Sequence, residues 1–566
     1  MNEEINTEDK YNKAISDRQS HVNEILNNQS NKKIVVAGPG TGKTFLFKEV
    51  LKGKNKTLTL TFVNALVEDL SLELCGISDV KTLHGFARGA FGTVKKKDAK
   101  GKDIKCGVKI SPILSRIIKE DAKILLSKDI DFDYIFQNLE DKKEEIEFYK
   151  RRKGYYDYYG YSDIVYAIVK YFEKEKDKIP SYDQVVVDEF QDFNKLEVAL
   201  IELLSEKNPI LLAGDDDQAL YDFKSASAEY IRMRYSEENK DYTSFTLPYC
   251  SRCTRIIVEA TNDIISSAIK NGNLKDRINK SYQYFEDINK DKESDKYPKI
   301  IYGQAFPKQI PWFIKERIEE IAEQEKKNFD VLIISPTKVQ SRLIVEALKT
   351  KGFKNIVTAD KKENTDICML DGLKLLLDDG KSNLGWRIVA KFLFNNQDFT
   401  TLLNETNKDN PKNITELVNK KIKKEVNEML KTLKALEDDK IKIDEENFSS
   451  LLRKIKMDPY KIVRNILKDK INSEINIGNP GIRKIPIKTA TIQGSKGLSA
   501  EYVFITHFDD QYFIKNKDKN IISDQDICNF IVAMTRARKK VILVSSNKKD
   551  PTFLGWINQD RVERLS

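Results

Sequence analysis

Short runs of consecutive apolar residues, each followed by glycine or by charged residues, recur along the 566-residue chain. Runs of this length that are apolar at nearly every position are typical of buried β-strands. On this pattern we predict strands at residues 34–37, 185–187, 210–213, 331–334, 487–492, 502–506 and 541–544.

Two further segments have the apolar spacing of a helix. One is formed by Ile164, Val165, Ile168 and Val169. The other begins where Asn413 and Glu416 are spaced as a capping pair. Its apolar stripe comprises Ile414, Leu417, Val418, Ile422, Val426, Met429, Leu433 and Leu436. We interpret this stripe as the buried side of a helical region.

Length and cysteine usage narrow the class of protein. A chain of 566 residues is too long for one hydrophobic core, so three or four compact units are expected. Among six scattered cysteines only Cys250 and Cys253 are close enough for half a metal site, and with three histidines we do not expect zinc or iron–sulfur ligation. The polar N-terminus and the lack of a membrane-length apolar run favour a cytoplasmic protein with no membrane partner.

The charge balance gives only a weak indication of the binding partner. The net charge of +9 is small beside 97 basic and 88 acidic residues, so composition only hints at a polyanionic partner. One glycine-containing segment concentrates lysine at Lys95, Lys96, Lys97, Lys100, Lys102, Lys105 and Lys109. This segment either touches a phosphate backbone or is a solvated loop in a lysine-rich chain.

The first predicted strand leads into a glycine-rich turn made of Gly38, Pro39, Gly40, Thr41, Gly42, Lys43 and Thr44. Glycines let the backbone N–H groups turn inward around phosphates, and the positive end of the following helix favours the same anion. Lys43 is expected to reach the outer phosphates, and Thr44 to bind Mg²⁺ through its hydroxyl. Ala37 stands where the general phosphate-loop pattern has glycine.

The apolar run Val185–Val187 is followed directly by two adjacent carboxylates, Asp188 and Glu189. Asp188 is expected to hold the same Mg²⁺, and Glu189 to orient or deprotonate the attacking water. A glycine turn and an unrelated acidic strand end would be the simpler interpretation. Both halves occur in strand context, however, so hydrolysis of a nucleoside triphosphate is favoured.

A further predicted strand, Ile210–Ala213, precedes an acidic turn, a glutamine and two aromatic residues. Two motifs therefore stand one after the other in the chain. The first is Asp188, Glu189, Phe190, Gln191, Asp192, and the second is Gly214, Asp215, Asp216, Asp217, Gln218, Ala219, Leu220, Tyr221. At these residues the chain resembles superfamily 1A DNA helicases of the UvrD, Rep and PcrA type. Their second motif reads Asp-Glu-Phe-Gln-Asp, and their third reads Gly-Asp-Asp-x-Gln-x-x-Tyr.

The resemblance extends over most of the chain. Gln19 lies where the family's glutamine reads the adenine edge. Thr61, Phe62 and Asn64 match the motif that grips DNA, and His84 belongs to a threonine–aliphatic–histidine motif. Arg252 corresponds to the motif IV arginine. Residues 491–498, with Lys496 and Gly497, resemble motif V, and residues 532–537, with Arg536, match motif VI.

The resemblance implies roles for these residues. Lys43, Asp188, Glu189, Gln218, Arg252 and Arg536 would be the catalytic set for ATP with Mg²⁺. Residues Gln19, Ala37–Thr44 and Gly497 would complete the nucleotide site. Arg252 and Arg536 would close over the γ-phosphate from a second domain, and Gln218 would link it to the DNA side. Thr61, Phe62, Asn64, His84, Tyr221, Phe223 and Lys496 would contact DNA, the aromatic residues by stacking on bases.

The chain departs from the family pattern in three motifs. Ser251 replaces the tyrosine that stacks on adenine, and Tyr249, two residues away, cannot be assumed to replace it. Gln493 and Ser499 stand where motif V has histidine and glutamate, so ribose contact and coupling are expected to differ. Lys224 and Ser225 replace an arginine–glycine pair, which keeps the charge without a planar guanidinium.

The motif order of the resemblance implies an α/β fold with two RecA-like P-loop domains, 1A and 2A, each with a mainly helical insertion, 1B and 2B. Domain 1A would comprise residues 1–87 and 181–246, with insertion 1B at 88–180. Domain 2A would comprise residues 247–360 and 483–566, with insertion 2B at 361–482. The tyrosines at 155, 156, 158, 159 and 161 of insertion 1B either stack on DNA or pack an interdomain seam.

Two functions of different classes follow. The first is an ATP-dependent helicase or translocase on single-stranded or 3′-tailed DNA that moves 3′ to 5′, in DNA repair, replication or antiphage defence. The second is a DNA-sensing ATPase subunit that regulates a separate nuclease subunit, as in a Gabija-like defence complex. A DNA-binding module with dead catalytic residues is not favoured, because the catalytic residue types are all present.

Overall fold

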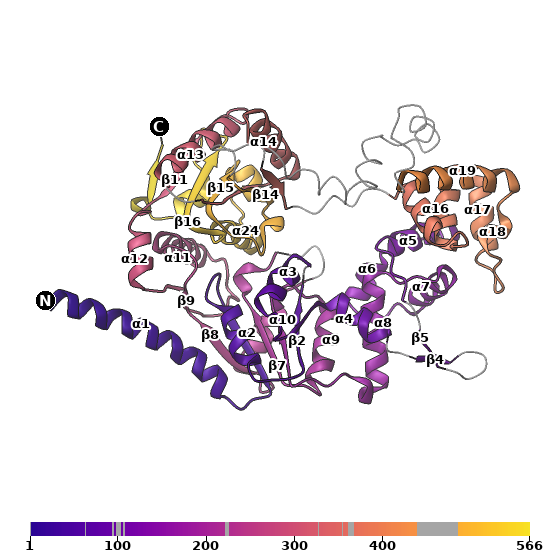
Figure 1. Cartoon of the computed structure of the whole chain (residues 1–566), viewed down its shortest axis with the longest axis horizontal. Helices are drawn as coiled ribbons and strands as arrows, with labels where there is room; N and C mark the ends of the chain where they lie inside the picture. Colours follow the sequence, from indigo (N-terminus) through magenta and orange to yellow (C-terminus); the bar gives the residue numbers. More distant parts are fainter. Residues whose placement is uncertain are drawn as a thin grey trace. The chain divides into compact units, whose positions relative to one another are not determined.

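Two parallel β-sheets organise the chain. In the first sheet the strands follow the order β3-β2-β6-β7-β1-β8, and neighbouring strands all run parallel. The strands are β1 (Lys32–Ala37), β2 (Thr57–Thr61), β3 (Asp79–Thr82), β6 (Gln184–Val187), β7 (Ile210–Gly214) and β8 (Thr243–Leu247). The indigo and magenta strands of Figure 1 therefore lie side by side although they are far apart in sequence.

This strand order brings the predicted motifs together. Because β6, β7 and β1 are neighbours and parallel, the segments that follow them meet at one edge of the sheet. Those segments are the glycine-rich turn after β1, the Asp188–Glu189 pair after β6 and the acidic turn after β7. The flanking helices are α1 (Asn2–Asn27), α2 (Lys43–Leu51), α3 (Asn64–Glu73), α9 (Lys195–Ser205) and α10 (Glu229–Tyr235).

The second sheet has the order β13-β14-β12-β15-β16-β11-β17, and its strands also run parallel. They are β11 (Ile300–Gln304), β12 (Val331–Ser335), β13 (Ile356–Thr358), β14 (Ile487–Thr491), β15 (Ala500–Thr506), β16 (Ala537–Ser545) and β17 (Val562–Arg564). Along β12, Leu332 and Ile334 join one apolar core while Val331 and Ile333 join another. Helices cover both faces, which explains why these strands are apolar throughout.

The helices of the second sheet are α11 (Arg255–Lys270), α12 (Ile288–Ser294), α13 (Ile310–Gln324), α14 (Lys338–Thr350), α23 (Asp510–Phe513) and α24 (Asp524–Met534). A short parallel pair, β9 (Tyr249–Cys250) and β10 (Gln283–Tyr284), lies in the segment between the two sheets. Two residues beside this pair, Arg252 and Tyr282, contact the glycine-rich turn.

The computed structural model describes the chain apart from residues 1, 63, 93–94, 98–102, 106–107, 221–225, 326–327, 354, 360–366, 438–484 and 566. It divides into two compact units. Unit 1 contains both sheets and comprises Met1–Phe86, Val169–Lys361 and Pro480–Ser566. Unit 2 comprises Ala87–Ile168 and Lys362–Asn479. The two insertions thus contribute to a single unit, while the division into 1A, 1B, 2A and 2B stays a prediction.

Unit 2 is mainly helical within its described residues. Its helices are α5 (Leu114–Leu125), α6 (Phe132–Gln137), α7 (Lys143–Tyr156), α15 (Met369–Asp378), α16 (Asn383–Leu393), α17 (Asn396–Glu405), α18 (Ile414–Leu417) and α19 (Lys420–Glu437). Helices α4 (Leu83–Gly92) and α8 (Tyr161–Lys174) cross the boundary between the units, and the lysine-rich segment forms an antiparallel pair of β4 (Lys95–Lys97) and β5 (Asp103–Lys105).

The structure refines the prediction for the apolar stripe. Ile414, Val418, Val426, Met429 and Leu433 are buried as expected, but α18 ends at Leu417 and α19 begins at Lys420. Val418 between them has an extended backbone. The pattern therefore predicted the buried face correctly and missed the break. The α/β fold with parallel sheets is confirmed, and no helix among the described residues is long and apolar enough to cross a membrane.

Candidate nucleotide site

The glycine-rich turn has the backbone geometry of a phosphate loop. Gly40 and Gly42 have positive φ values of 72° and 96°, which side chains resist, and Gly42 is the N-cap of α2 with no side chain capping that helix. The N–H groups of the first turn of α2 are thus available to an anion. Lys43 donates from Nζ to the carbonyl of Ala37 at 3.2 Å, so its ammonium lies over the turn.

Residues of the β9–β10 segment close one side of this turn. The hydroxyl of Tyr282 donates to the carbonyl of Pro39 at 3.0 Å, and a Cβ placed on Gly38 would lie 2.7 Å from the Tyr282 ring. A Cβ on Gly40 would lie 2.5 Å from Cβ of Arg252. These contacts require glycine at both positions, and they place the Arg252 side chain against the loop.

The two carboxylates after β6 differ in ionisation. Burial raises the pKa of Asp188, and the neighbouring Glu189 carboxylate raises it further. Burial acts in the same direction on Glu189, but Lys43, Lys496, Gln191 and Arg536 outweigh it and lower its pKa. Glu189 also has a left-handed backbone, with φ of 55°. An ionised Glu189 suits a residue that accepts a proton from water.

The donors at this edge of the sheet fit a magnesium nucleotide. The Thr44 hydroxyl and the Asp188 carboxylate are hard oxygen ligands of the kind Mg²⁺ prefers. Asp188 is 6% exposed, and burial together with the Glu189 charge raises its pKa although Lys43 and Lys496 act in the opposite direction, so its negative charge is only partly compensated. A bound divalent cation would supply that compensation.

A chain of hydrogen bonds leads from Glu189 to the second sheet. Gln191 donates from Nε2 to Glu189 Oε2 at 2.6 Å, and its Oε1 accepts from the backbone N–H of Asp215 at 2.9 Å. Asp215 Oδ2 accepts from Gln218 Nε2 at 2.6 Å, and Gln218 Oε1 accepts from Arg536 Nη2 at 2.9 Å. Glu189 is therefore connected to Arg536 through a series of hydrogen bonds.

Arg252 and Arg536 lie close enough for their charges to interact. Burial, and then the charge of Arg252, lower the pKa of Arg536 to about 10. Arg536 is 3% exposed and also donates from Nε to the carbonyl of Val532 at 3.0 Å. Two guanidinium groups held near each other in a buried site favour binding of an anion between or beside them.

Lys496, predicted as a DNA contact, lies in the same site. Its Nζ is 2.6 Å from Asp192 Oδ2 and 3.8 Å from Glu189 Oε2, and it donates to the carbonyl of Gln218 at 2.6 Å. Lys496 is 6% exposed. The structure thus places this lysine among the carboxylates that follow β6 and not on a surface. Gly497 beside it has a positive φ of 84°.

A pocket beside the turn is lined by Arg18, His21, Val22, Thr41, Gly42, Phe45, Leu247, Pro248 and Tyr249. Tyr249 contacts His21 edge to face, with ring centroids 6.0 Å apart, and Arg18 lies over the Phe285 ring. Ser251, which replaces the expected tyrosine, hydrogen-bonds through its backbone N–H to the carbonyl of Gly40. Gln19 is exposed and donates to Asn23 at 2.9 Å, so it does not line this pocket.

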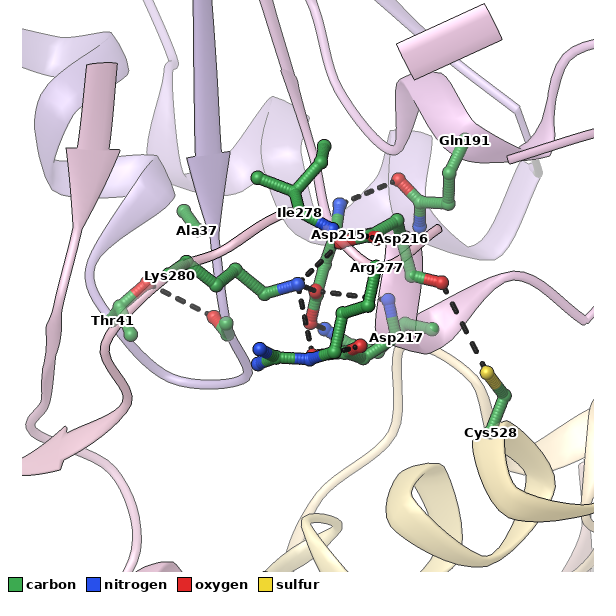
Figure 2. Close-up of polar contacts among 12 residues, drawn as sticks. Ala37, Thr41, Gln191, Asp215, Asp216, Asp217, Arg277, Ile278, Lys280 and Cys528 are labelled. Carbon is green, nitrogen blue, oxygen red and sulfur yellow. Dashed lines mark hydrogen bonds and ion pairs between the residues drawn. The ribbon is translucent and has the colours of Figure 1, made fainter. Parts of the chain in front are cut away.

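An acidic cluster follows β7. Asp215, Asp216 and Asp217 are buried, and among the described residues they form the one group of three that could hold a metal ion. The ammonium of Lys280 occupies the position between them (Figure 2), 2.9 Å from an oxygen of Asp215 and 2.9 Å from one of Asp217, with a closer contact to Asp216. The cluster does not include Thr44 or Asp188, the two residues predicted to hold Mg²⁺.

The predicted DNA-contact residues are only partly described. Thr61 ends β2 and is buried, and its hydroxyl has no hydrogen-bond partner among the described residues. Phe62 packs edge to face on Phe193 at 5.8 Å, and His84 lies in the first turn of α4. Asn64 is the first residue of α3. Tyr221 and Phe223 lie outside the described residues, as do Lys224 and Ser225.

Sequence reasoning missed several residues of the site. Gln191 belongs to the Asp188–Asp192 motif, so the sequence did indicate that its side chain could contact the neighbouring carboxylate. Lys280 and Tyr282 lie in a segment without a recognised motif, and only the structure brings them to the phosphate loop and the acidic turn.

Comparison with known proteins agrees with this geometry. A family profile described as "AAA domain" matches residues 20–224. The chain is 27% identical over 194 residues to DNA helicase II of Haemophilus influenzae, covering 33% of this chain and 24% of that protein. It is 26% identical over 289 residues to the ATP-dependent DNA helicase PcrA of Bacillus subtilis, covering 45% and 37%.

One relative matches along most of its length. A probable DNA helicase II homolog of Mycoplasma genitalium is 22% identical over 631 aligned residues, covering 93% of this chain and 85% of that protein. The chain spans less than half of the Haemophilus and Bacillus proteins. By these matches the chain is similar to DNA helicase II and PcrA proteins, the superfamily 1 helicases of the UvrD, Rep and PcrA type that its motifs resemble.

Proposed function

We propose that this chain hydrolyses ATP with Mg²⁺ and uses the cycle to move 3′ to 5′ along single-stranded DNA. The hydrogen-bonded path from Glu189 through Gln191, Asp215 and Gln218 to Arg536 carries the proposal. Through such a path, loss of the γ-phosphate on hydrolysis would change the position of Arg536 and with it the orientation of the second sheet relative to the first.

In the proposed hydrolysis, each side of the site has its own task. The turn at Gly40–Gly42 and Lys43 bind the phosphates, while Thr44 and Asp188 would hold Mg²⁺, which neutralises the phosphate charge. Glu189, kept ionised by nearby cations, takes the proton of the attacking water. Arg252 and Arg536 stabilise the negative charge that develops on the transferred phosphoryl group.

The residues that line the pocket beside the phosphate loop carry groups suited to contact a nucleobase. Tyr249 and Phe45 offer aromatic faces there, and Arg18 offers a guanidinium. Tyr249 would supply the stacking that Ser251 cannot. Because stacking of a base on an aromatic ring contributes about 1–3 kcal/mol, Tyr249→Ala should raise the Kd for ATP by about tenfold or more. Tyr134→Ala, at an exposed tyrosine of unit 2, is the control and should leave the Kd unchanged.

The central test measures ATP hydrolysis with and without single-stranded DNA. We expect stimulation by DNA in the wild-type chain, and loss of about 10²–10⁴-fold in kcat for Glu189→Gln because its amide cannot accept a proton. Lys43→Ala should abolish hydrolysis, whereas Lys48→Ala, on the exposed side of α2, should not. Hydrolysis that does not respond to DNA, or that survives both site substitutions, would refute the proposal.

A strand-displacement assay tests the direction of movement along DNA and whether the chain acts without a partner. Duplexes with 3′ or 5′ single-stranded tails should be unwound from the 3′ tail alone. Strong DNA-stimulated hydrolysis with little unwinding, together with co-purification of a nuclease in stoichiometric amounts, would favour instead a regulatory ATPase subunit of a nuclease complex.

A further inference from the structure

Lys280 lies between three buried carboxylates and is itself 9% exposed. It belongs to the segment that runs from α11 to β10, and it reaches the acidic turn after β7 of the first sheet (Figure 2). Burial opposes the charged form of Lys280, but Asp215, Asp217 and Asp216 together raise its pKa. The ammonium is thus a fixed cation in a position where a metal ion could otherwise bind.

The three cations of this cluster have different partners. Arg277 pairs with Asp217 at 2.8 Å, and Arg232 pairs with Asp216 at 3.3 Å. Lys280 contacts Asp217 and Asp216 and also reaches Asp215. Asp215 holds the ammonium through Oδ1 and the side-chain amide of Gln218 through Oδ2. Gln218 in turn presents its carbonyl oxygen to Arg536.

We propose that Lys280 is a positioning residue for Gln218. Its ammonium keeps Asp215 ionised and fixed in orientation, so Asp215 accepts from Gln218 Nε2 and leaves Gln218 Oε1 facing Arg536. Without the ammonium, three adjacent buried carboxylates repel one another, and an Asp215 that rotates or takes up a proton no longer holds the amide. This inference rests on the proposed role of Gln218 and Arg536 in hydrolysis.

A purely structural role for Lys280 makes a different prediction. In the native cluster three carboxylates face three cations, Lys280, Arg277 and Arg232, and loss of Lys280 leaves one uncompensated negative charge. Asp217→Asn removes one negative charge without touching the bond between Asp215 and Gln218. In a Lys280→Met, Asp217→Asn double variant the charges balance again, but Asp215 still lacks the ammonium.

The experiment uses the full chain with saturating single-stranded DNA. It measures kcat, the Kd for a fluorescent ATP analogue and the thermal midpoint. For Lys280→Met we expect kcat to fall about 10- to 100-fold with little change in Kd, because a displaced positioning group impairs the reaction more than binding. The double variant should recover most of the lost thermal midpoint while kcat stays low. Arg232→Gln, whose arginine contacts Asp216 on the same cluster, should keep the wild-type kcat.

Three results would overturn the inference. They are a wild-type kcat in Lys280→Met, an equal loss in Arg232→Gln, or recovery of kcat together with thermal stability in the double variant. If Lys280→Met does not fold, the double variant alone decides, since a folded double variant with normal kcat contradicts the proposal. A wild-type chain with no DNA-stimulated hydrolysis would instead refute the proposed function itself.

Discussion

Two buried ionic clusters join distant segments of this chain, and they differ in where their hydrogen bonds lead. In unit 2, Asp121 accepts from Arg152 Nε at 3.0 Å through one oxygen and from Arg387 Nε at 3.0 Å through the other. In unit 1, three carboxylates surround Lys280, and one of them continues through Gln218 to Arg536. The hydrogen bonds of the first cluster stay within unit 2, whereas those of the second continue into the candidate nucleotide site.

The difference separates a structural role from a functional one. Arg152 and Arg387 each donate two hydrogen bonds to Asp121, and Arg152 also donates to the carbonyl of Thr406. These bonds tie the first insertion to the second, 266 residues further along the chain. The tyrosines of the first insertion add to the same seam: Tyr156 is buried, and the Tyr155 hydroxyl donates to the carbonyl of Lys412. A cluster of this type should affect folding more than turnover.

The largest effect is expected at the end of the unit 1 path. Arg536→Ala removes a guanidinium that would stabilise the transition state, and such arginines contribute about 10³–10⁵-fold to kcat. The measurement is DNA-stimulated ATP hydrolysis. Arg538→Ala is the matched control, because Arg538 lies two residues further on and pairs with Asp330 at the surface. Equal losses in both variants would show that the path does not end at a catalytic group.

An intermediate effect is expected in unit 2, on stability. Arg387→Met leaves Asp121 buried with one guanidinium fewer, and breaking a buried pair typically costs about 3–5 kcal/mol of unfolding free energy. Lys391→Met, one turn further along α16, removes only a partly exposed pair with Glu120 and should cost about 1 kcal/mol or less. Denaturant unfolding measures both. A large loss of kcat per folded molecule in Arg387→Met would remove the contrast between the clusters.

The smallest effect concerns pH. Burial alone would raise the pKa of Asp121, but Arg387 and Arg152 reverse this and hold it below its ordinary value near 3.8. A depressed folded-state pKa contributes stability above pH 3.8 that is lost as the pH falls through the folded-state value. The stability difference between wild type and Arg387→Met should therefore be constant from about pH 7 to 5 and narrow below pH 4. Hydrogen exchange in α5 and α16 across this range checks the prediction.

Local patterns in the sequence predicted much of unit 1. Apolar runs gave the strands at residues 34–37, 185–187 and 331–334, because strands buried on both faces are apolar throughout. The phosphate loop and the two carboxylates could be placed because each follows its strand directly. The sheet order then brings them to one edge.

Contacts between distant segments were not predictable. Nothing local to Lys280 or Asp121 indicates a partner, since a charged residue in a loop or within a surface helix is usually solvated. The place of Lys496 beside Glu189 was missed for a related reason. Family resemblance gave its residue type a role at DNA, whereas its actual surroundings depend on how motif V packs against Asp192.

The strand order of the first sheet has a consequence for synthesis of the chain. Strand β1 pairs with β7 and β8, which begin about 170 and 200 residues after it ends. At translation rates of roughly 5–20 residues per second, β1 leaves the ribosome on the order of ten seconds or more before either neighbour exists. The phosphate loop is thus among the first functional segments made, yet it gains its sheet framework only after the whole first insertion has been translated.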